Sequence, residues 1–179
     1  MSDIVILQGS PRKGGNTEIL VNAFAEGARE HNTVKIISVR EYKVHPCIGC
    51  NACFNREGNA CAQQDDMQKI YPELARADIL VIATPVYFYG PGAQIKAVID
   101  RLHTPLRDTF KIKRTGLLCV AAATIPGLFD AIRAEYRLAM NFFHLESIGE
   151  ICVPGVKDKG DILGNSALDT ARKLGSDVR

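Results

Sequence analysis

Apolar runs alternate with amphipathic stretches along the whole chain. The segments DIVILQG, residues 3–9, and ADILVIATP, residues 77–85, are continuous apolar runs that end in Gly or Pro. Such runs are typical of strands buried on both faces of a parallel sheet. Between them, residues 19–28 carry an apolar stripe at helical spacing, and NTVKIISV, residues 32–39, alternates apolar and polar positions, which favours an edge strand.

The same alternation continues toward the C-terminus. Apolar residues recur at helical spacing from Ile95 to Leu102, and further segments predict a strand at 115–123, a helix at 126–143 opened by Pro126, a strand at 147–153 and a helix at 165–174. The helical face from Met67 to Leu74 contains Pro72, which should kink or restart that helix. Strands alternating with helices predict an α/β fold: a flavodoxin-like doubly wound parallel sheet of five strands, order 2-1-3-4-5, with helices on both faces.

Composition narrows the class of protein. The 179 residues are 46% hydrophobic and 23% charged, as expected for a single domain over 1–179. The net charge is +2 with both signs scattered, which favours neither a nucleic-acid face nor a membrane-binding helix. The apolar run near the N-terminus is too short for a signal peptide, so we expect a cytoplasmic protein whose thiols stay reduced.

The first strand is followed by a glycine-rich loop, GSPRKGGNT, residues 9–17. Gly9 and Gly14 have the spacing of a nucleotide P-loop, but Gly15 replaces its Lys and Asn16 its Ser or Thr, and the dinucleotide fingerprint is absent. Backbone N–H groups and a helix N-terminus still converge there. Together with Ser10, Arg12 and Thr17 they suit one terminal phosphate, such as that of FMN. The alternative is a turn that only connects strand to helix.

A second loop, TPVYFYGPGAQIK at residues 84–96, follows the third strand. In a doubly wound sheet, ligands bind beyond the carboxyl ends of the strands, so both loops should face one crevice. The adjacent Tyr87, Phe88 and Tyr89 offer apolar faces for a planar heterocycle. They could equally cover core or form a dimer contact.

The two loops and their spacing resemble those of the NAD(P)H-dependent FMN reductases, a match that runs from the first strand to about Arg101. The resemblance implies FMN as cofactor, NAD(P)H as a co-substrate, and a small-molecule or protein electron donor and acceptor. The phosphate of FMN would be held by Ser10, Arg12, Asn16 and Thr17. The isoalloxazine ring would contact Pro85, Val86, Tyr87, Phe88, Tyr89 and Gly90, with Thr124 closing its other side.

Four of the six cysteines lie in CIGCNACFNREGNAC, residues 47–61, with the spacing C-x2-C-x2-C-x7-C. Three cysteines on one tight loop fit a cubane iron–sulfur cluster better than zinc, which more usually takes two separated C-x2-C pairs. The long last gap differs from the ferredoxin spacing. A zinc site and reduced or reversibly oxidised thiols remain alternatives. Cys119 and Cys152 lie in apolar strand patterns and are expected in the core.

The cysteine motif also resembles that of the iron-sulfur flavoproteins, a branch of the same FMN-binding fold. This resemblance implies a [4Fe-4S] cluster on a loop at 45–64, with Cys47, Cys50, Cys53 and Cys61 as ligands. It also implies a homo-oligomer, a dimer or tetramer, in which the cluster passes electrons to a flavin of the neighbouring subunit. The order of the strands places the loop on the flavin side of the sheet.

The sequence therefore predicts an FMN-dependent oxidoreductase that moves electrons from NAD(P)H or a redox carrier to an acceptor, directly or through the cluster. Flavin chemistry requires no acid or base from a side chain, so no catalytic residue is assigned. The alternative is a non-enzymatic redox or metal sensor that uses the four-cysteine loop.

Overall fold

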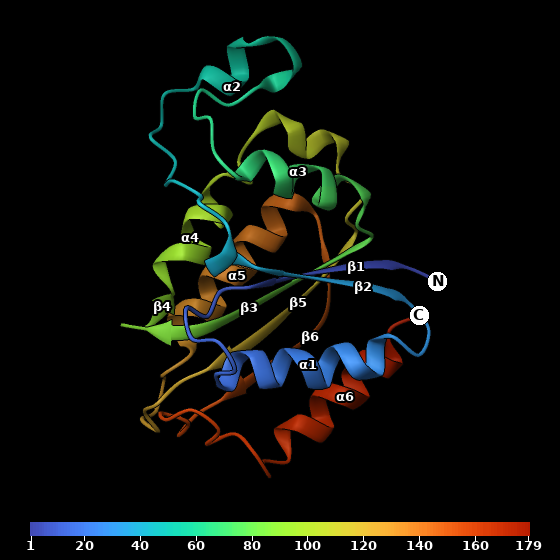
Figure 1. The fold of residues 1–179 in the computed structure, drawn as a ribbon, viewed down its shortest axis with the longest axis vertical. Helices are drawn as coiled ribbons and strands as arrows, with labels where there is room; N and C mark the ends of the chain where they lie inside the picture. The colour runs from blue at the N-terminus through green and yellow to red at the C-terminus, as the bar shows by residue number, and fades with distance from the viewer.

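A twisted sheet forms the centre of the molecule (Figure 1). The computed structural model describes residues 1–179. Neighbouring strands follow the order β2-β1-β3-β5-β6 and are all parallel, while the two-residue β4 pairs antiparallel with β3. The strands are β1 (Asp3–Gln8), β2 (Thr33–Ser38), β3 (Ile79–Tyr87), β4 (Gly90–Pro91), β5 (Arg114–Val120) and β6 (Glu146–Val153).

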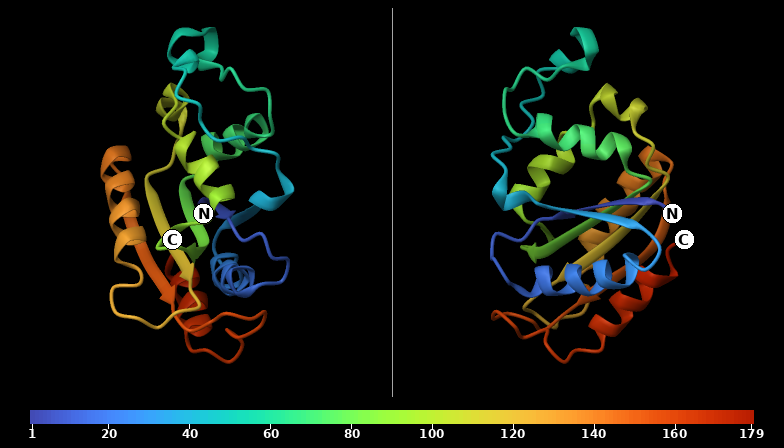
Figure 2. Two further views of the ribbon diagram at one scale, coloured as in Figure 1. Left: turned by 90° about the vertical axis from the view of Figure 1, so that its left-hand side faces the viewer. Right: turned by 45° about the vertical axis from the view of Figure 1, so that its right-hand side comes forward.

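Helices cover both faces of the sheet (Figures 1 and 2). Helices α1 and α6 lie side by side on one face, and α3, α4 and α5 lie on the other. The helices are α1 (Asn16–Ala28), α2 (Ala52–Asn55), α3 (Met67–Arg76), α4 (Ala93–Asp100), α5 (Asp130–Phe143) and α6 (Ala167–Asp177), with short 3₁₀ turns η1 (Val39–Glu41), η2 (Glu57–Asn59) and η3 (Pro105–Thr109).

A hydrophobic core lies on each face of the sheet, and the continuous apolar run of β1 contributes side chains to both. Successive side chains of a strand point to opposite faces, so Ile4 and Ile6 join the cluster under α1 and α6, while Val5 and Leu7 join the cluster under α3 and α4. This is why a central strand of a parallel sheet is apolar throughout. The edge strand β2 alternates exposed and half-buried residues from Thr33 to Ile36, as its sequence pattern predicts.

The predicted α/β fold with a parallel sheet is confirmed, with corrections. Six strands are present, in the order 2-1-3-5-6, and not five in the order 2-1-3-4-5, because residues 86–91 form a hairpin that adds β4. Helix α3 runs through Pro72 without a break. Its residues Ile70 and Leu74 are fully buried, so packing offsets the backbone hydrogen bond that proline cannot donate. Helix α5 begins at Asp130 and not at Pro126, after a turn.

A cysteine-bearing segment projects away from the body of the fold. It leaves β2 through η1, carries α2 and η2, and returns to α3 (Figure 1). No residue from Arg40 to Asp66 is buried. We call residues 45–64 the cysteine loop. No helix of the chain combines the length and the apolar character needed to cross a membrane.

Candidate functional site

The first loop forms a turn between β1 and α1 that is organised by Ser10. Ser10 is 4% exposed, and its Oγ accepts a hydrogen bond from the Arg12 N–H at 3.2 Å. The N-cap of α1 is Gly15, and no side chain caps the first N–H groups of the helix. Thr17 is also buried, at 1% exposed. Buried hydroxyls beside an uncapped helix N-terminus fit the phosphate group of a cofactor.

The side chain of Asn16 joins the first loop to the loop at 154–164. Its Nδ2 donates to the Asp158 carbonyl at 2.8 Å, and its Oδ1 accepts from the N–H groups of Gly160 and Ile162 at 3.0 and 3.4 Å. Arg12 Nη1 likewise donates to the Lys157 carbonyl at 2.8 Å. Asn16 and Arg12 therefore hold the 154–164 loop against the first loop, a role that the sequence did not indicate.

The 154–164 loop brings two lysines close to the first loop, although Asp158 and Asp161 balance their charge within the loop. Lys157 lines the crevice beside Ser10, and a Cβ on Gly14 would lie 3.0 Å from Lys159 Nζ. Neither lysine is among the site residues predicted from the sequence. The signal was available as two lysines separated by one residue in a glycine-containing loop after the last strand. Cations near an anion-binding turn strengthen the case for a phosphate.

The second loop is a tight hairpin with aromatic residues at its tip. Tyr87 pairs with Gly90 across it, and the two residues between them, Phe88 and Tyr89, have φ of 48° and 69°. Such left-handed backbone costs roughly 1–2 kcal/mol per residue for side chains other than Gly. Phe88 is 97% exposed. Strain of this kind collects at functional sites, so the hairpin is a candidate contact surface.

The two loops meet at a crevice of about 280 Å³ beyond the carboxyl ends of β1, β3 and β5. Predicted residues that line it are Ser10, Arg12, Asn16, Thr17, Pro85, Val86 and Tyr87. Val120, Ala121, Ala122, Val156 and Lys157 complete the lining. Phe88, Tyr89, Gly90 and the exposed Thr124 do not line the crevice. Its polar end fits a phosphate and its apolar end fits a planar ring.

The cysteine loop encloses a second cavity, of about 380 Å³. All four predicted ligands, Cys47, Cys50, Cys53 and Cys61, line it. All six cysteines of the chain are free thiols, and Cys61 Sγ accepts a hydrogen bond from the Gln63 N–H at 3.4 Å. No three His, Cys, Asp or Glu side chains are arranged to hold a metal ion. The donor set therefore suits a thiolate-bound cluster, but the thiols would have to move together to bind it.

Two aspartates close the neck of the cysteine loop. Asp65 accepts the His45 N–H at 2.9 Å, and Asp66 accepts the Lys43 N–H at 2.8 Å. Asp65 also forms a buried ion pair with Arg101. Burial by itself would raise the pKa of Asp65, but hydrogen bonds from His45, Arg101 and Met67 outweigh it and lower the pKa below its usual 3.8. The loop therefore has a fixed base and an unburied tip.

The cavity and the crevice lie at opposite ends of α4. No residue lines both. Gly92, which precedes α4, lies against Tyr87, whereas Arg101, which follows it, lines the cysteine cavity. Eight helical residues span about 12 Å. The cysteine loop leaves the sheet at the same edge as the crevice and then turns away along α4.

The remaining cysteines belong to the sheet. Cys119 is fully buried in the cluster beneath α5, and Cys152 packs against that cluster as its partner on β6. A hydrogen bond with the neighbouring Cys152, together with burial, raises the pKa of the Cys119 thiol well above its usual range. These properties match the predicted core position of Cys119.

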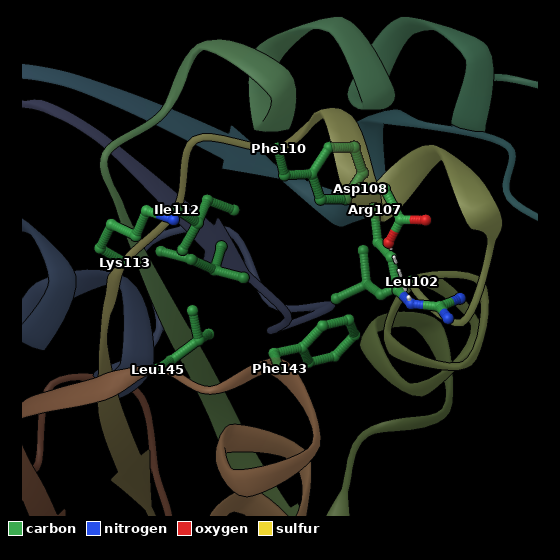
Figure 3. Close-up of a pocket in the computed structure, with 9 residues that line it drawn as sticks. Leu102, Arg107, Asp108, Phe110, Ile112, Lys113, Phe143 and Leu145 are labelled. Atoms are coloured by element: carbon green, nitrogen blue, oxygen red, sulfur yellow. Dashed lines mark ion pairs between the residues drawn. The ribbon is translucent and has the colours of Figure 1, made fainter.

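A third cavity, of about 230 Å³, lies at the amino ends of β3, β5 and β6 (Figure 3). Leu80, Phe143 and Leu145 contribute apolar walls, and the Arg107–Asp108 ion pair lies at one side. In parallel sheets, ligands bind at the carboxyl ends of the strands, so this cavity is a weaker candidate than the crevice.

Comparisons with known proteins agree with the crevice. A family model described as NADPH-dependent FMN reductase matches residues 2–150. An iron-sulfur flavoprotein of Methanocaldococcus jannaschii is 33% identical over 196 residues, covering 98% of this chain and 94% of that protein. Among solved structures, an NAD(P)H:quinone oxidoreductase from Methanothermobacter marburgensis has a TM-score of 0.77 at 18% identity, covering 98% of this chain and 96% of that one. An FMN-dependent NADH-azoreductase from Bacillus anthracis in complex with FMN has a TM-score of 0.70 at 15% identity, covering 97% and 98%.

Proposed function

The chain belongs to the NADPH-dependent FMN reductase family, and from this premise we propose that it passes electrons from NAD(P)H or a redox carrier to an acceptor. The observation that carries this proposal is the crevice between the two loops, with buried hydroxyls and an uncapped helix N-terminus at one end and an apolar wall at the other. When bound, FMN supplies both hydride and single-electron chemistry.

The chain's own residues bind and orient the cofactor. Ser10, Thr17 and the first N–H groups of α1 hold the phosphate, and Lys157 compensates its charge. Pro85 and Tyr87 form one wall for the ring, and Ala121 lies across the crevice. The apolar walls exclude water from the ring. None of the wall residues is an acid or base that the reaction needs.

The test is binding and turnover with purified apoprotein. Titration with FMN and, separately, with riboflavin measures how much of the affinity the phosphate provides. We expect FMN to bind at least tenfold more tightly, because charge-assisted hydrogen bonds to phosphate contribute about 1.5–3 kcal/mol. We also expect the loaded protein to oxidise NADPH or NADH with a quinone or azo acceptor. Equal affinity for FMN and riboflavin, or no flavin binding, would overturn the proposal.

We further propose that Cys47, Cys50, Cys53 and Cys61 hold a [4Fe-4S] cluster. Their common cavity, their spacing and the full-length similarity to an iron-sulfur flavoprotein support this assignment. No residue of the loop is buried, so the thiols can close around a cluster without breaking core contacts. Iron and sulfide assays on protein purified without oxygen test it. If the protein instead contains zinc, the four cysteines form a zinc site. If it contains no metal after reconstitution, they are reduced or reversibly oxidised thiols.

A sensor function for the cysteine loop remains the second candidate, because no residue lines both the loop cavity and the crevice. A Cys50→Ser variant distinguishes the enzyme function from the sensor function. An enzyme that routes electrons through the loop loses turnover with acceptors served by the cluster. A sensor keeps full NAD(P)H oxidation in that variant.

We also propose that the chain forms a homo-oligomer. The strained hairpin tip exposes Phe88 almost completely, and Tyr89 is 45% exposed beside it. Such an aromatic pair suits a contact between subunits. Light scattering on the purified protein tests this directly, and a monomer at micromolar concentration would contradict it.

A further inference from the structure

The floor of the cysteine cavity contains a buried arginine with unused hydrogen-bond donors. Arg101 follows α4, and its side chain is only 2% exposed. A guanidinium has five N–H groups and no acceptor, so each donor that lies out of water needs a partner. The side chain lines the same cavity as the four cysteines.

Only one of the three guanidinium nitrogens has a partner. Nη1 pairs with the Asp65 carboxylate and also lies 3.4 Å from the His45 carbonyl. Nε and Nη2 are buried and have no hydrogen-bond partner. One carboxylate could have received two parallel N–H groups, which is the usual geometry of an Arg–Asp pair. Arg101 thus lines the sulfur-bearing cavity while two of its nitrogens, both buried beneath the cavity surface, lack an acceptor within the protein.

The charges around the cavity leave Arg101 as its only buried cation. Asp100 also lines the cavity, but its carboxylate is paired with Lys96 outside it. Burial by itself would lower the pKa of Arg101, but the hydrogen bond and the negative charge of Asp65 raise it. Four thiolates that bind a cluster carry net negative charge, and reduction adds one electron to it.

We propose that Arg101 is the residue that compensates the charge of the cysteine cavity, donating its free Nε and Nη2 hydrogens to the sulfur atoms of the cluster held there. This inference rests on the proposed cluster. Asp65 orients the guanidinium and ties the neck of the loop to α4, so the donors are fixed before the cluster binds. Arg101 is a positioning residue for the loop and a tuning residue for the redox centre.

Hydrogen bonds to cluster sulfur favour the more negative, reduced state and so raise the reduction potential. Loss of both donors should therefore move the potential to a more negative value. We expect the equilibrium constant for reduction to fall at least tenfold, which corresponds to about 59 mV for one electron. A lysine at this position keeps the charge but not the fork geometry, so its potential should lie between the two.

The experiment compares Arg101→Lys and Arg101→Met with the unmodified protein, all purified without oxygen. Iron, sulfide and FMN are assayed per chain, and the potential is measured by a titration followed by electron paramagnetic resonance. Arg172→Met is the matched control, because Arg172 forms ion pairs on α6, far from the cavity. We expect the potential to fall in the order unmodified, lysine, methionine, and to stay unchanged in the control.

The methionine variant leaves Asp65 buried without its partner and can fail to fold for that reason. The double variant Asp65→Asn with Arg101→Met removes both charges, and its FMN content reports whether the crevice is intact. A purely structural role for Arg101 predicts less iron but an unchanged potential in the clusters that remain. That result would overturn the proposal.

The failure of the cluster assignment is distinguishable from the failure of the Arg101 assignment. Unmodified protein that takes up no iron after reconstitution removes the cluster, and with it the role given to Arg101. Unmodified protein that holds iron, with the same potential in the lysine and methionine variants, removes only the role of Arg101.

Discussion

Replacement of Asn16 by alanine should separate the phosphate end of the crevice from the loop that covers it. The side chain is 7% exposed, and it makes three hydrogen bonds to backbone groups of residues 158–162. Each contributes about 0.5–1.5 kcal/mol, and the freed backbone groups can regain part of that from water. We expect the free energy of unfolding of the apoprotein to fall by about 2–3 kcal/mol.

The same substitution should weaken cofactor binding in a specific way. Once the 154–164 loop is released, Lys157 no longer has a fixed position beside Ser10. A charge-assisted contact to phosphate contributes about 1.5–3 kcal/mol, so the affinity for FMN should fall about tenfold or more. Riboflavin has no phosphate, so its affinity should change little. The difference between the two ligands is therefore the informative quantity.

Urea unfolding of the apoprotein and fluorescence titrations with FMN and riboflavin measure both effects. Asn141→Ala is the matched control, because Asn141 is exposed on α5 and its side chain makes no hydrogen bond within the protein. The reasoning is refuted if Asn16→Ala keeps the full preference for FMN over riboflavin. Equal loss of both ligands would mean that the crevice itself, and not the phosphate end, depends on the loop.

Three further predictions concern stability and turnover. In the Gly175→Ala variant, the new Cβ would lie 2.1 Å from the Phe24 carbonyl oxygen. The resulting overpacking should cost about 1–3 kcal/mol and outweigh the gain of about 1 kcal/mol that alanine brings to a helix, so the melting temperature should fall. The double variant Phe88→Asn with Tyr89→Gly relieves the left-handed backbone strain, so its free energy of unfolding should rise by about 1–2 kcal/mol. Its NAD(P)H turnover and its self-association should decrease. Unchanged stability would show that these two residues are not strained. The pKa of Asp65 is lowered in the folded protein, so the stability that its carboxylate contributes is present above about pH 3.8 and is lost as the pH falls below that value. The Asp65→Asn variant should therefore be less stable than the unmodified protein at pH 7 and should lose less stability on acidification. Urea unfolding across the pH range measures both effects.

The parts of the fold that depend on local pattern could be predicted from the sequence. The apolar runs of β1 and β3 identify central strands, because a strand buried on both faces has no polar side to show. The first loop and the 84–90 segment could be placed at one crevice, because carboxyl ends of parallel strands share an edge. The spacing of the four cysteines likewise places them on one short loop, and the structure adds that all four line one cavity.

The parts that depend on distant contacts could not be predicted. Asn16 contacts residues more than 140 positions away, so its role as a link to the 154–164 loop has no local signature. The hairpin at Phe88 and Tyr89 was missed because its turn lacks the Gly or Asn that normally signals left-handed backbone. Arg101 could not be singled out, since its burial depends on Asp65 in a separate segment.

The position of α4 explains how one small domain keeps the crevice and the cysteine cavity apart. Its first residues follow the hairpin that flanks the crevice, and its last residue and Arg101 form part of the cysteine cavity. Helix α4 is about 12 Å long and is anchored in the core by Ile95 and Val98, so it holds the hairpin and Arg101 at opposite ends. The cysteine loop, by contrast, is held by hydrogen bonds at its neck and by a ring contact between Phe54 and His103, and none of its residues is buried. Changes in the loop can therefore alter the chemistry of the cavity while the crevice, which depends on the sheet, keeps its shape.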